Sequence, residues 1–105
     1  MKFYNVQEEL PKHGEVVLLI DITSGSFGEV MFDAEKSVFA VFDSLANRVV
    51  TNSIDIYTSS HRWWWGRIHE HFPDEKERYS RLLKVNAWFS SSKKIEITSL
   101  LNKEI

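Results

Sequence analysis

Short apolar segments, separated by turn-forming residues, recur at nearly even spacing through the first half of the chain. They are Val16–Ile22, Glu29–Phe32 and Val38–Phe42, and the first connection contains Gly25 and Gly28. This rhythm is typical of antiparallel strands joined by tight turns, where glycine supplies the positive φ that such turns often need. The pattern therefore predicts a β-meander.

The middle of the chain continues the apolar pattern with less regular spacing. Between Arg48 and Thr58 the polar run 51–53 interrupts the apolar residues, which predicts either one long bent strand or two short ones. The segment from His61 to Ile68 contains three consecutive tryptophans, and consecutive bulky aromatic residues favour a strand that is covered on both faces. We therefore predict a further strand over 61–68.

A helix is predicted in the last third of the chain, beginning at Pro73 and Asp74. Proline is tolerated in the first helical turn, and the acidic residues that follow favour the positive end of the helix dipole. Glu77 and Arg81, four residues apart, form an outward-facing pair, and the serines 90–92 end the helix. One stripe of the helix contains Tyr79, Leu82, Leu83, Asn86 and Phe89. Beyond the helix, apolar and polar residues alternate over 94–98 as in a short edge strand. Residues 99–105 are predicted to form a last helical turn or two.

Together these segments predict one α+β domain over residues 1–105, in which four or five antiparallel strands between Val16 and Ile68 pack against the C-terminal helix. Because several strands are apolar on both faces, one helix does not cover them, and we predict either a curled, barrel-like sheet or a homodimer interface. The predicted core positions are Val16, Leu18, Ile20, Ile22, Val30, Phe32, Val38, Ala40, Phe42, Ile56, Trp64, Leu82, Leu83 and Phe89.

Composition limits the class of protein. The 105 residues include no cysteine, so a disulfide scaffold is excluded and a reducing, cytoplasmic compartment is expected. No signal peptide is recognisable, and the longest apolar run, Val16–Ile20, is far too short to cross a bilayer. The net charge of −2 gives the molecule no long-range attraction for nucleic acid or anionic lipid.

The most unusual segment is 62–67, in which three tryptophans lie between Arg62 and Arg67. On a strand, Trp63 and Trp65 would point to one face and Trp64 to the other. Core packing is the simplest interpretation of such a run. A binding site made of Arg62, Trp63, Trp65 and Arg67 is the second, because indole and guanidinium groups are frequent anchors in protein interfaces and also stack on single-stranded bases.

Histidines provide a weaker candidate for a metal site. His61, His69 and His71 carry imidazoles of the kind that zinc, nickel or iron bind, and on an extended segment His69 and His71 would share one face. Ordinary surface histidines are the favoured interpretation, because no further pair lies at a defining distance. We predict no cofactor.

Catalysis has little support in the sequence. Asp21 is the one acidic residue in a position where burial is expected, and an acid that ends a strand before a turn is its simpler interpretation. The loop 23–28 lacks the lysine of a phosphate-binding loop, and no nucleophile elbow is present. We therefore predict that the chain is not an enzyme.

The first residues of the chain resemble the start of small phage and prophage domains of unknown function. The matching residues are Val6, Glu9-Leu10-Pro11, Gly14 and Val16-Val17-Leu18. Those domains begin with a Trp-Ile-x-Val stretch, and here Phe3 or Tyr4 is the aromatic nearest to the leading tryptophan. They often close with His-Trp-x-Pro, which His61, Trp63 and Pro73 match only with different spacing. The resemblance covers about the first 22 residues. It implies a phage-encoded accessory protein that binds a host component.

Three functions follow as hypotheses. The first is a non-enzymatic module that binds a protein partner through aromatic anchors, such as a mobile-element protein acting on host defence. The second is a single-stranded nucleic-acid binder that uses segment 62–67. The third is a metal-dependent hydrolase that uses His61, His69 and His71.

Overall fold

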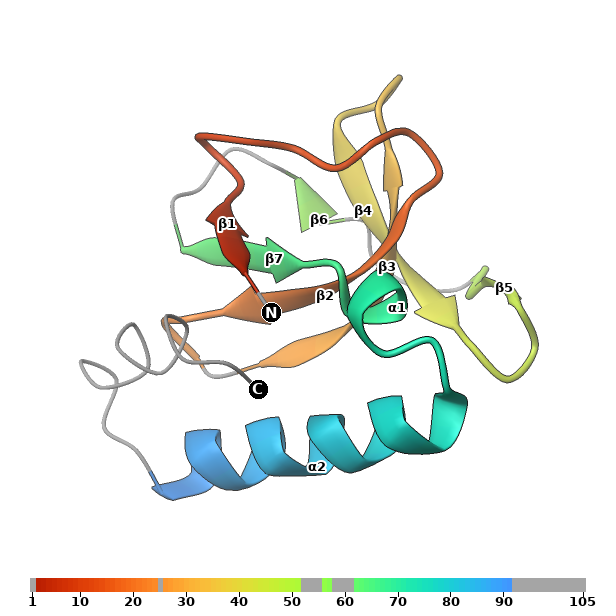
Figure 1. The fold of residues 1–105 in the computed structure, drawn as a ribbon. Coiled ribbons are helices and arrows are strands. Elements are labelled where there is room, and N and C mark those ends of the chain that lie inside the picture. The colour runs from red at the N-terminus through yellow and green to blue at the C-terminus, as the bar shows by residue number, and fades with distance from the viewer. Residues whose placement is uncertain (1, 25, 52–55, 58–61, 92–105) are drawn as a thin grey trace.

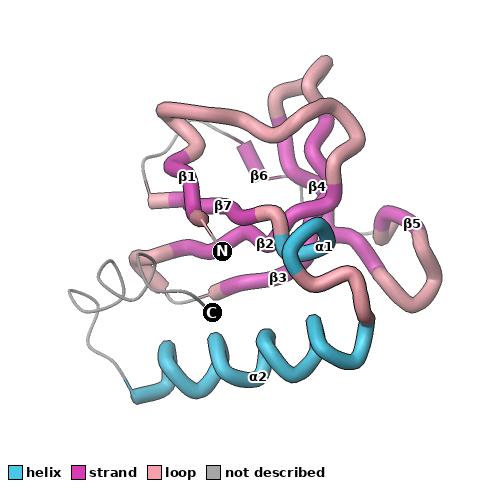
Figure 2. The backbone as a smooth tube through the Cα atoms, viewed as in Figure 1, coloured by secondary structure: helices cyan, strands magenta, loops and turns pink. Residues whose placement is uncertain are grey.

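The structure is a computed structural model that describes residues 2–24, 26–51, 56–57 and 62–91. Within these ranges the elements, in chain order, are β1 (Phe3–Asn5), β2 (Val16–Asp21), β3 (Phe27–Asp33), β4 (Val38–Asp43), β5 (Arg48–Val49), β6 (Ile56–Tyr57), β7 (Trp63–Gly66), α1 (Ile68–His71) and α2 (Glu75–Ser91). All strand pairs are antiparallel, in the order β1-β7-β2-β3-β4-β5, with β6 on β4 (Figures 1 and 2). The α+β class predicted from sequence is confirmed.

The predicted meander corresponds to β2, β3, β4 and β5, which are adjacent in space as in sequence. Two strands depart from that simple order. β1 belongs to a segment in which the sequence analysis identified no strand, and β7 returns from far along the chain to lie between β1 and β2. Trp65 of β7 thus pairs with Tyr4 on one side and with Leu19 on the other. The segment 48–58 contains two short strands, β5 and β6, which is the second of the two predicted alternatives.

The strand predicted over 61–68 is shorter in the structure, and its end was predicted wrongly. β7 stops at Gly66, and Ile68–His71 form the short helix α1, in which the Phe72 N–H donates to the Ile68 carbonyl at 2.8 Å. Ile68 is fully buried in the cluster that contains Leu18 of β2. The chain turns helical here because one apolar side chain anchors the turn to the sheet.

The sheet is buried on both sides, because side chains alternate along its central strands. Toward the helices lies a cluster of Phe3, Leu18, Ile20, Ile68 and Phe72, against which Trp64 and Leu82 pack. The opposite side holds a second cluster of Val6, Val17, Leu19, Val30, Phe32, Phe39 and Trp65, with Trp63 and Ile56 packed against it. Figure 1 shows α2 along the first side, and the long loop from β1 to β2 belongs to the second, where Val6 is buried.

The sheet curls but does not close into a barrel. Its path ends at β1 and β5. Residues of β2, β4, β6 and β7 nevertheless line a common cavity of about 240 Å³, among them Leu19, Val41, Ile56 and Trp63. Among the strands that the structure describes the sheet is not closed, so the predicted barrel-like closure is not observed there.

The predicted helix is confirmed as α2, together with its outward pair, in which Arg81 Nη2 lies 3.7 Å from Glu77 Oε1. The Glu77 N–H donates to Asp74 Oδ1 at 2.9 Å, which is the hydrogen bond of an N-cap. Leu82 packs toward the sheet, whereas Leu83 is 54% exposed, so its predicted core position is wrong. The helix rotates Leu83 outward because Arg78 and Leu82, four residues apart, share the inner side.

Most of the other predicted core positions are buried or partly buried. The buried ones are Leu18, Ile20, Val30, Phe32, Val38 and Phe42. The partly buried ones are Val16, Ile22, Ala40, Ile56, Trp64 and Leu82. The side chain of Phe89, the predicted edge strand over 94–98 and the final turns over 99–105 lie outside the described part of the chain.

Candidate functional site

The tryptophan run occupies β7, and its side chains alternate between the two faces as the sequence predicts. Trp65 is fully buried, its Nε1–H donates to the Glu9 carbonyl at 2.8 Å, and its ring stacks on Tyr4 with centroids 4.8 Å apart. Trp64 packs toward the helices, and Trp63 is half-buried on the face of Trp65. Trp65 is therefore a core residue, and its ring is not presented to a partner.

The two arginines that flank the run are paired with acids of the same chain. Arg62 forms an ion pair with Asp21, with its Nε 3.0 Å from Asp21 Oδ2, and its guanidinium lies 5.5 Å from the centre of the Trp63 ring. Arg67 Nε lies 2.7 Å from Glu15 Oε2, and its guanidinium lies 4.7 Å from the Trp65 ring. Both cations thus have a carboxylate partner before any ligand arrives.

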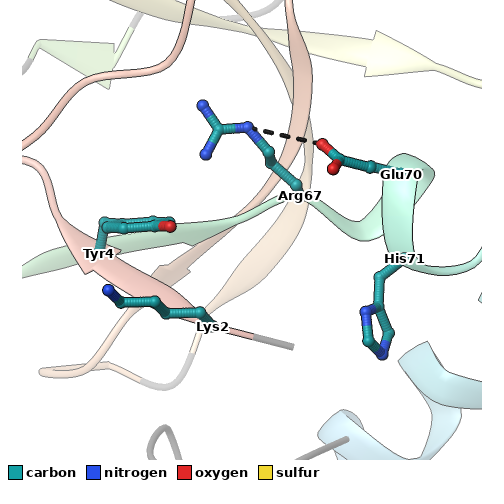
Figure 3. Close-up of a pocket in the computed structure, with 5 residues that line it drawn as sticks. All are labelled: Lys2, Tyr4, Arg67, Glu70 and His71. Atoms are coloured by element: carbon teal, nitrogen blue, oxygen red, sulfur yellow. Dashed lines mark ion pairs between the residues drawn. The ribbon is translucent and has the colours of Figure 1, made fainter.

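Arg67 also lines a pocket of about 240 Å³ between β1 and α1, together with Lys2, Tyr4, Glu70 and His71 (Figure 3). Figure 3 shows Glu70 facing the guanidinium of Arg67, with Nε 3.8 Å from Oε2. The Lys2 ammonium lies 4.9 Å from the centre of the Tyr4 ring. Arg67 is therefore already paired with the carboxylates of Glu15 and Glu70, whereas Lys2 lies over a neutral ring.

The histidines do not converge on a metal site within the described part of the chain. His69 and His71 lie on α1, so the extended geometry in which they would share one face is wrong. His69 Nε2 lies 2.8 Å from Glu29 Oε2, whereas His71 lines the pocket beside Arg67. No cluster of three or more potential ligands occurs among the described residues, and His61 lies outside them.

A larger cavity, of about 430 Å³, separates the first turns of α2 from β3 and the turn between β4 and β5. It is lined by Glu29, Ser44, Leu45, Glu75, Lys76, Arg78, Tyr79 and Leu82. Three chain segments that are distant in sequence therefore meet around one concave space, a usual setting for a binding site.

Glu29 is the acidic group at the inner wall of this cavity. Its carboxylate is mostly buried and accepts a hydrogen bond from the Ser44 hydroxyl, and its Oε2 also lies against His69. These contacts join β3, the β4–β5 turn and α1 at one point. The Glu29 carboxylate is therefore already used within the fold.

Arg78 is the less exposed of the two basic groups that line the same cavity, at 9%. Its Nη1 donates to the carbonyls of Phe72 at 3.0 Å and Pro73 at 2.7 Å. Its Nε is buried without an acceptor, and no carboxylate among the described residues forms an ion pair with it. A buried guanidinium without a counter-charge is uncommon, because removing it from water is costly unless it is paired.

The outer rim of the cavity is apolar and exposed to solvent. Leu45 is 86% exposed and Tyr79 is 65% exposed, and both line the cavity. Leu83 lies one turn along α2 from Tyr79 and is exposed as well. We call Leu45, Tyr79 and Leu83 the α2 surface.

Sequence reasoning did not single out Arg78 or Leu45. A signal for Arg78 was present, because a residue four positions before Leu82 shares its side of a helix. Leu45 lies in the turn between β4 and β5, and nothing in the sequence indicates that α2 lies near that turn.

Comparison with known proteins identifies no relatives. No family model matches the chain, and neither the curated proteins nor the solved structures yield a significant match. Among the helices of the described residues, none combines the length and the apolar character that crossing a membrane demands.

Proposed function

We propose that this chain is a non-enzymatic protein-interaction module that binds its partner through the α2 surface. The observation behind the proposal concerns the three most exposed large apolar side chains of the described residues: Leu45 and Tyr79 line one cavity, and Leu83 lies one helical turn from Tyr79. Exposed apolar residues that cluster in this way are typical of contact surfaces, and tyrosine is a frequent anchor.

The aromatic site predicted from sequence contributes less to this proposal. Trp65 is in the core, so replacing it would disturb the fold together with any contact. Trp63, with Arg62 stacked against it, remains a candidate for a secondary contact, because Trp63 is only half-buried and Arg62 is exposed.

The alternative functions have weaker support. Nucleic-acid binding needs basic side chains that are available for phosphates, and Arg62 and Arg67 are each paired with an acid. A metal-dependent hydrolase needs converging ligands, and His69 and His71 point to different surroundings.

We propose further that the module acts in the cytoplasm, because its cysteine-free composition suits a reducing compartment. A role as a phage or mobile-element accessory protein is a proposal that rests on the resemblance of the N-terminal residues. In that case the partner is a host protein.

Site-specific photo-crosslinking in the natural host tests the proposal. A photoreactive phenylalanine analogue at Tyr79 is expected to give discrete covalent adducts with one partner, identified by mass spectrometry. The control position is Leu10, which is also exposed but lies in the β1–β2 loop, whose Glu9 carbonyl binds Trp65 on the opposite face of the sheet. The same set of adducts at both positions, or none above background, would contradict the proposal.

A matched pair of substitutions adds an independent readout. Leu45→Ser together with Tyr79→Ser should abolish capture of the crosslinked partner, whereas Leu10→Ser should not. Both positions of the double variant are exposed, so its free energy of unfolding should stay within about 0.5 kcal/mol per substitution of the original. Urea unfolding checks that loss of capture is not loss of fold.

A further inference from the structure

We propose that the cavity beside Arg78 is a binding site for a carboxylate side chain of the partner protein, held next to an apolar side chain that packs on Leu45 and Tyr79. The identity of the ligand as part of a partner protein rests on the proposed function. The site itself rests on the contacts around Arg78.

The first argument is the unbalanced charge of Arg78. Its guanidinium is buried, and its acceptors in the chain are the two carbonyls of Phe72 and Pro73, which carry only partial charge. Its Nε has no acceptor among the residues that the structure describes. A carboxylate that enters the cavity would supply the missing counter-charge through a charge-assisted hydrogen bond to the guanidinium.

The second argument concerns the other charged residues of the cavity. Glu29 makes its contacts with Ser44 and His69 and forms no ion pair with Arg78. Lys76 adds a second positive group to the lining, and Glu75 adds a negative one. Because two acids line the cavity, a singly charged carboxylate is better tolerated there than a doubly charged phosphate.

The third argument is the apolar wall. Leu45, Tyr79 and Leu82 line the same space, whose volume of about 430 Å³ lies within the usual range for ligand pockets. An acidic residue that enters alone would leave this wall exposed. A partner segment with an acidic residue beside a large aliphatic one satisfies Arg78 and covers the wall at the same time.

Nuclear magnetic resonance on the ¹⁵N-labelled full chain tests the site directly, because the Nε–H of Arg78 gives its own signal. The probes are two blocked dipeptides, acetyl-Leu-Asp-amide and acetyl-Leu-Asn-amide, which differ only in the charge of the second side chain. We expect the acidic peptide to shift the Arg78 Nε–H and Tyr79 backbone signals saturably. The affinity of the neutral peptide should be lower by a factor of about ten or more, because this peptide lacks the charge-assisted hydrogen bonds.

Variants separate the parts of the site. Arg78→Met should remove the preference for the acidic peptide, but Arg78 also ties α2 to the residues before it, so this variant can lose its fold. Leu45→Ser with Tyr79→Ser leaves Arg78 in place, and we expect it to weaken binding of the acidic peptide severalfold. Leu10→Ser is the control and should leave the titration unchanged.

Three results would overturn the inference. They are equal shifts with both peptides, no saturable shift at Arg78, and binding of octanoate without binding of the acidic peptide, which would make the ligand a small apolar acid. The proposed function fails separately. Peptide binding at Arg78 without a specific crosslink from Tyr79 would refute the partner protein and keep the carboxylate site, whereas a specific crosslink without a carboxylate preference would refute only the site.

Discussion

Three aspartates, Asp21, Asp33 and Asp43, end successive strands, and each caps the turn that follows it. Their Oδ1 atoms accept hydrogen bonds from the backbone N–H two residues on, at 2.9 to 3.0 Å. An aspartate in this position stabilises a turn by imitating a backbone acceptor. The last residues before the next strand, Ser37 and Asn47, have positive φ, which completes two of these turns without glycine.

Asp21 differs from the other two aspartates because its carboxylate is buried. Burial opposes ionisation, but hydrogen bonds from Arg62, Thr23 and Ser24, together with the charge of Arg62, outweigh it and lower the pKa of Asp21 to about 2, from an ordinary 3.8. The group is therefore charged throughout the neutral range. Its ion pair joins the end of β2 to the residue that precedes β7.

The low pKa of Asp21 predicts a loss of stability in acid. A carboxyl whose pKa is lower in the folded than in the unfolded state stabilises the fold above the unfolded value, and this contribution disappears as the pH falls. For Asp21 it amounts to about 2 kcal/mol, complete above about pH 5 and absent near pH 1. Asp21→Asn should therefore have a lower free energy of unfolding than the original chain at neutral pH, with the difference shrinking toward pH 2.

Urea unfolding of both proteins across this pH range measures the difference. Asp33→Asn is a suitable control, because Asp33 is not buried and its turn hydrogen bonds can be kept by the asparagine oxygen. A difference between Asp21→Asn and the original chain that stays constant from neutral pH to pH 2 would contradict the assignment.

At the level of elements, α2 depends on its ends and on a narrow inner side. Asp74 caps its first turn, and Arg78 and Leu82 face inward. Arg81 adds a contact in which its guanidinium lies 4.8 Å from the centre of the Phe72 ring. Because Asp74 satisfies a backbone donor of the first turn, this cap contributes to holding the start of the helix.

Removing that cap gives a second prediction. Asp74→Ala deletes the acceptor for the Glu77 N–H and should lower the free energy of unfolding by about 1 kcal/mol. Asp74→Ser keeps a capping oxygen and should cost only a few tenths of that. Urea unfolding measures both variants, and equal losses from alanine and serine would show that the cap is not the cause.

At the scale of the whole molecule, the two sides of the sheet are built differently. On the side of Trp65, the β1–β2 loop contributes Val6, and Glu9 accepts the indole N–H, so loop and strands enclose one cluster. On the other side, Leu82 is the α2 side chain that packs on the cluster among those the structure describes, and the cavity beside Arg78 separates the first turns of the helix from β3. The helix is therefore expected to open more easily than the sheet.

Native-state hydrogen exchange tests this expectation. The amides of β2 and β7, each of which is paired with a strand on both sides, should exchange only through global unfolding. The amides of α2 should exchange faster, through local opening, and the acidic dipeptide that binds Arg78 should slow them. Exchange of α2 at the same rate as β2 would show that helix and sheet open as one unit.

The sequence by itself determined the local features, because these depend on neighbours in the chain. Short apolar segments separated by turn residues specified the strands from Val16 to Phe42, the acid-rich start specified α2, and the period of two placed Trp64 opposite Trp63 and Trp65. Tertiary structure decided the long-range pairings. It inserted β7 between β1 and β2 and turned Ile68–His71 into a helix, and it brought Leu45 close to Tyr79. Such contacts depend on which distant surfaces exclude water together, and no short window of sequence contains that information.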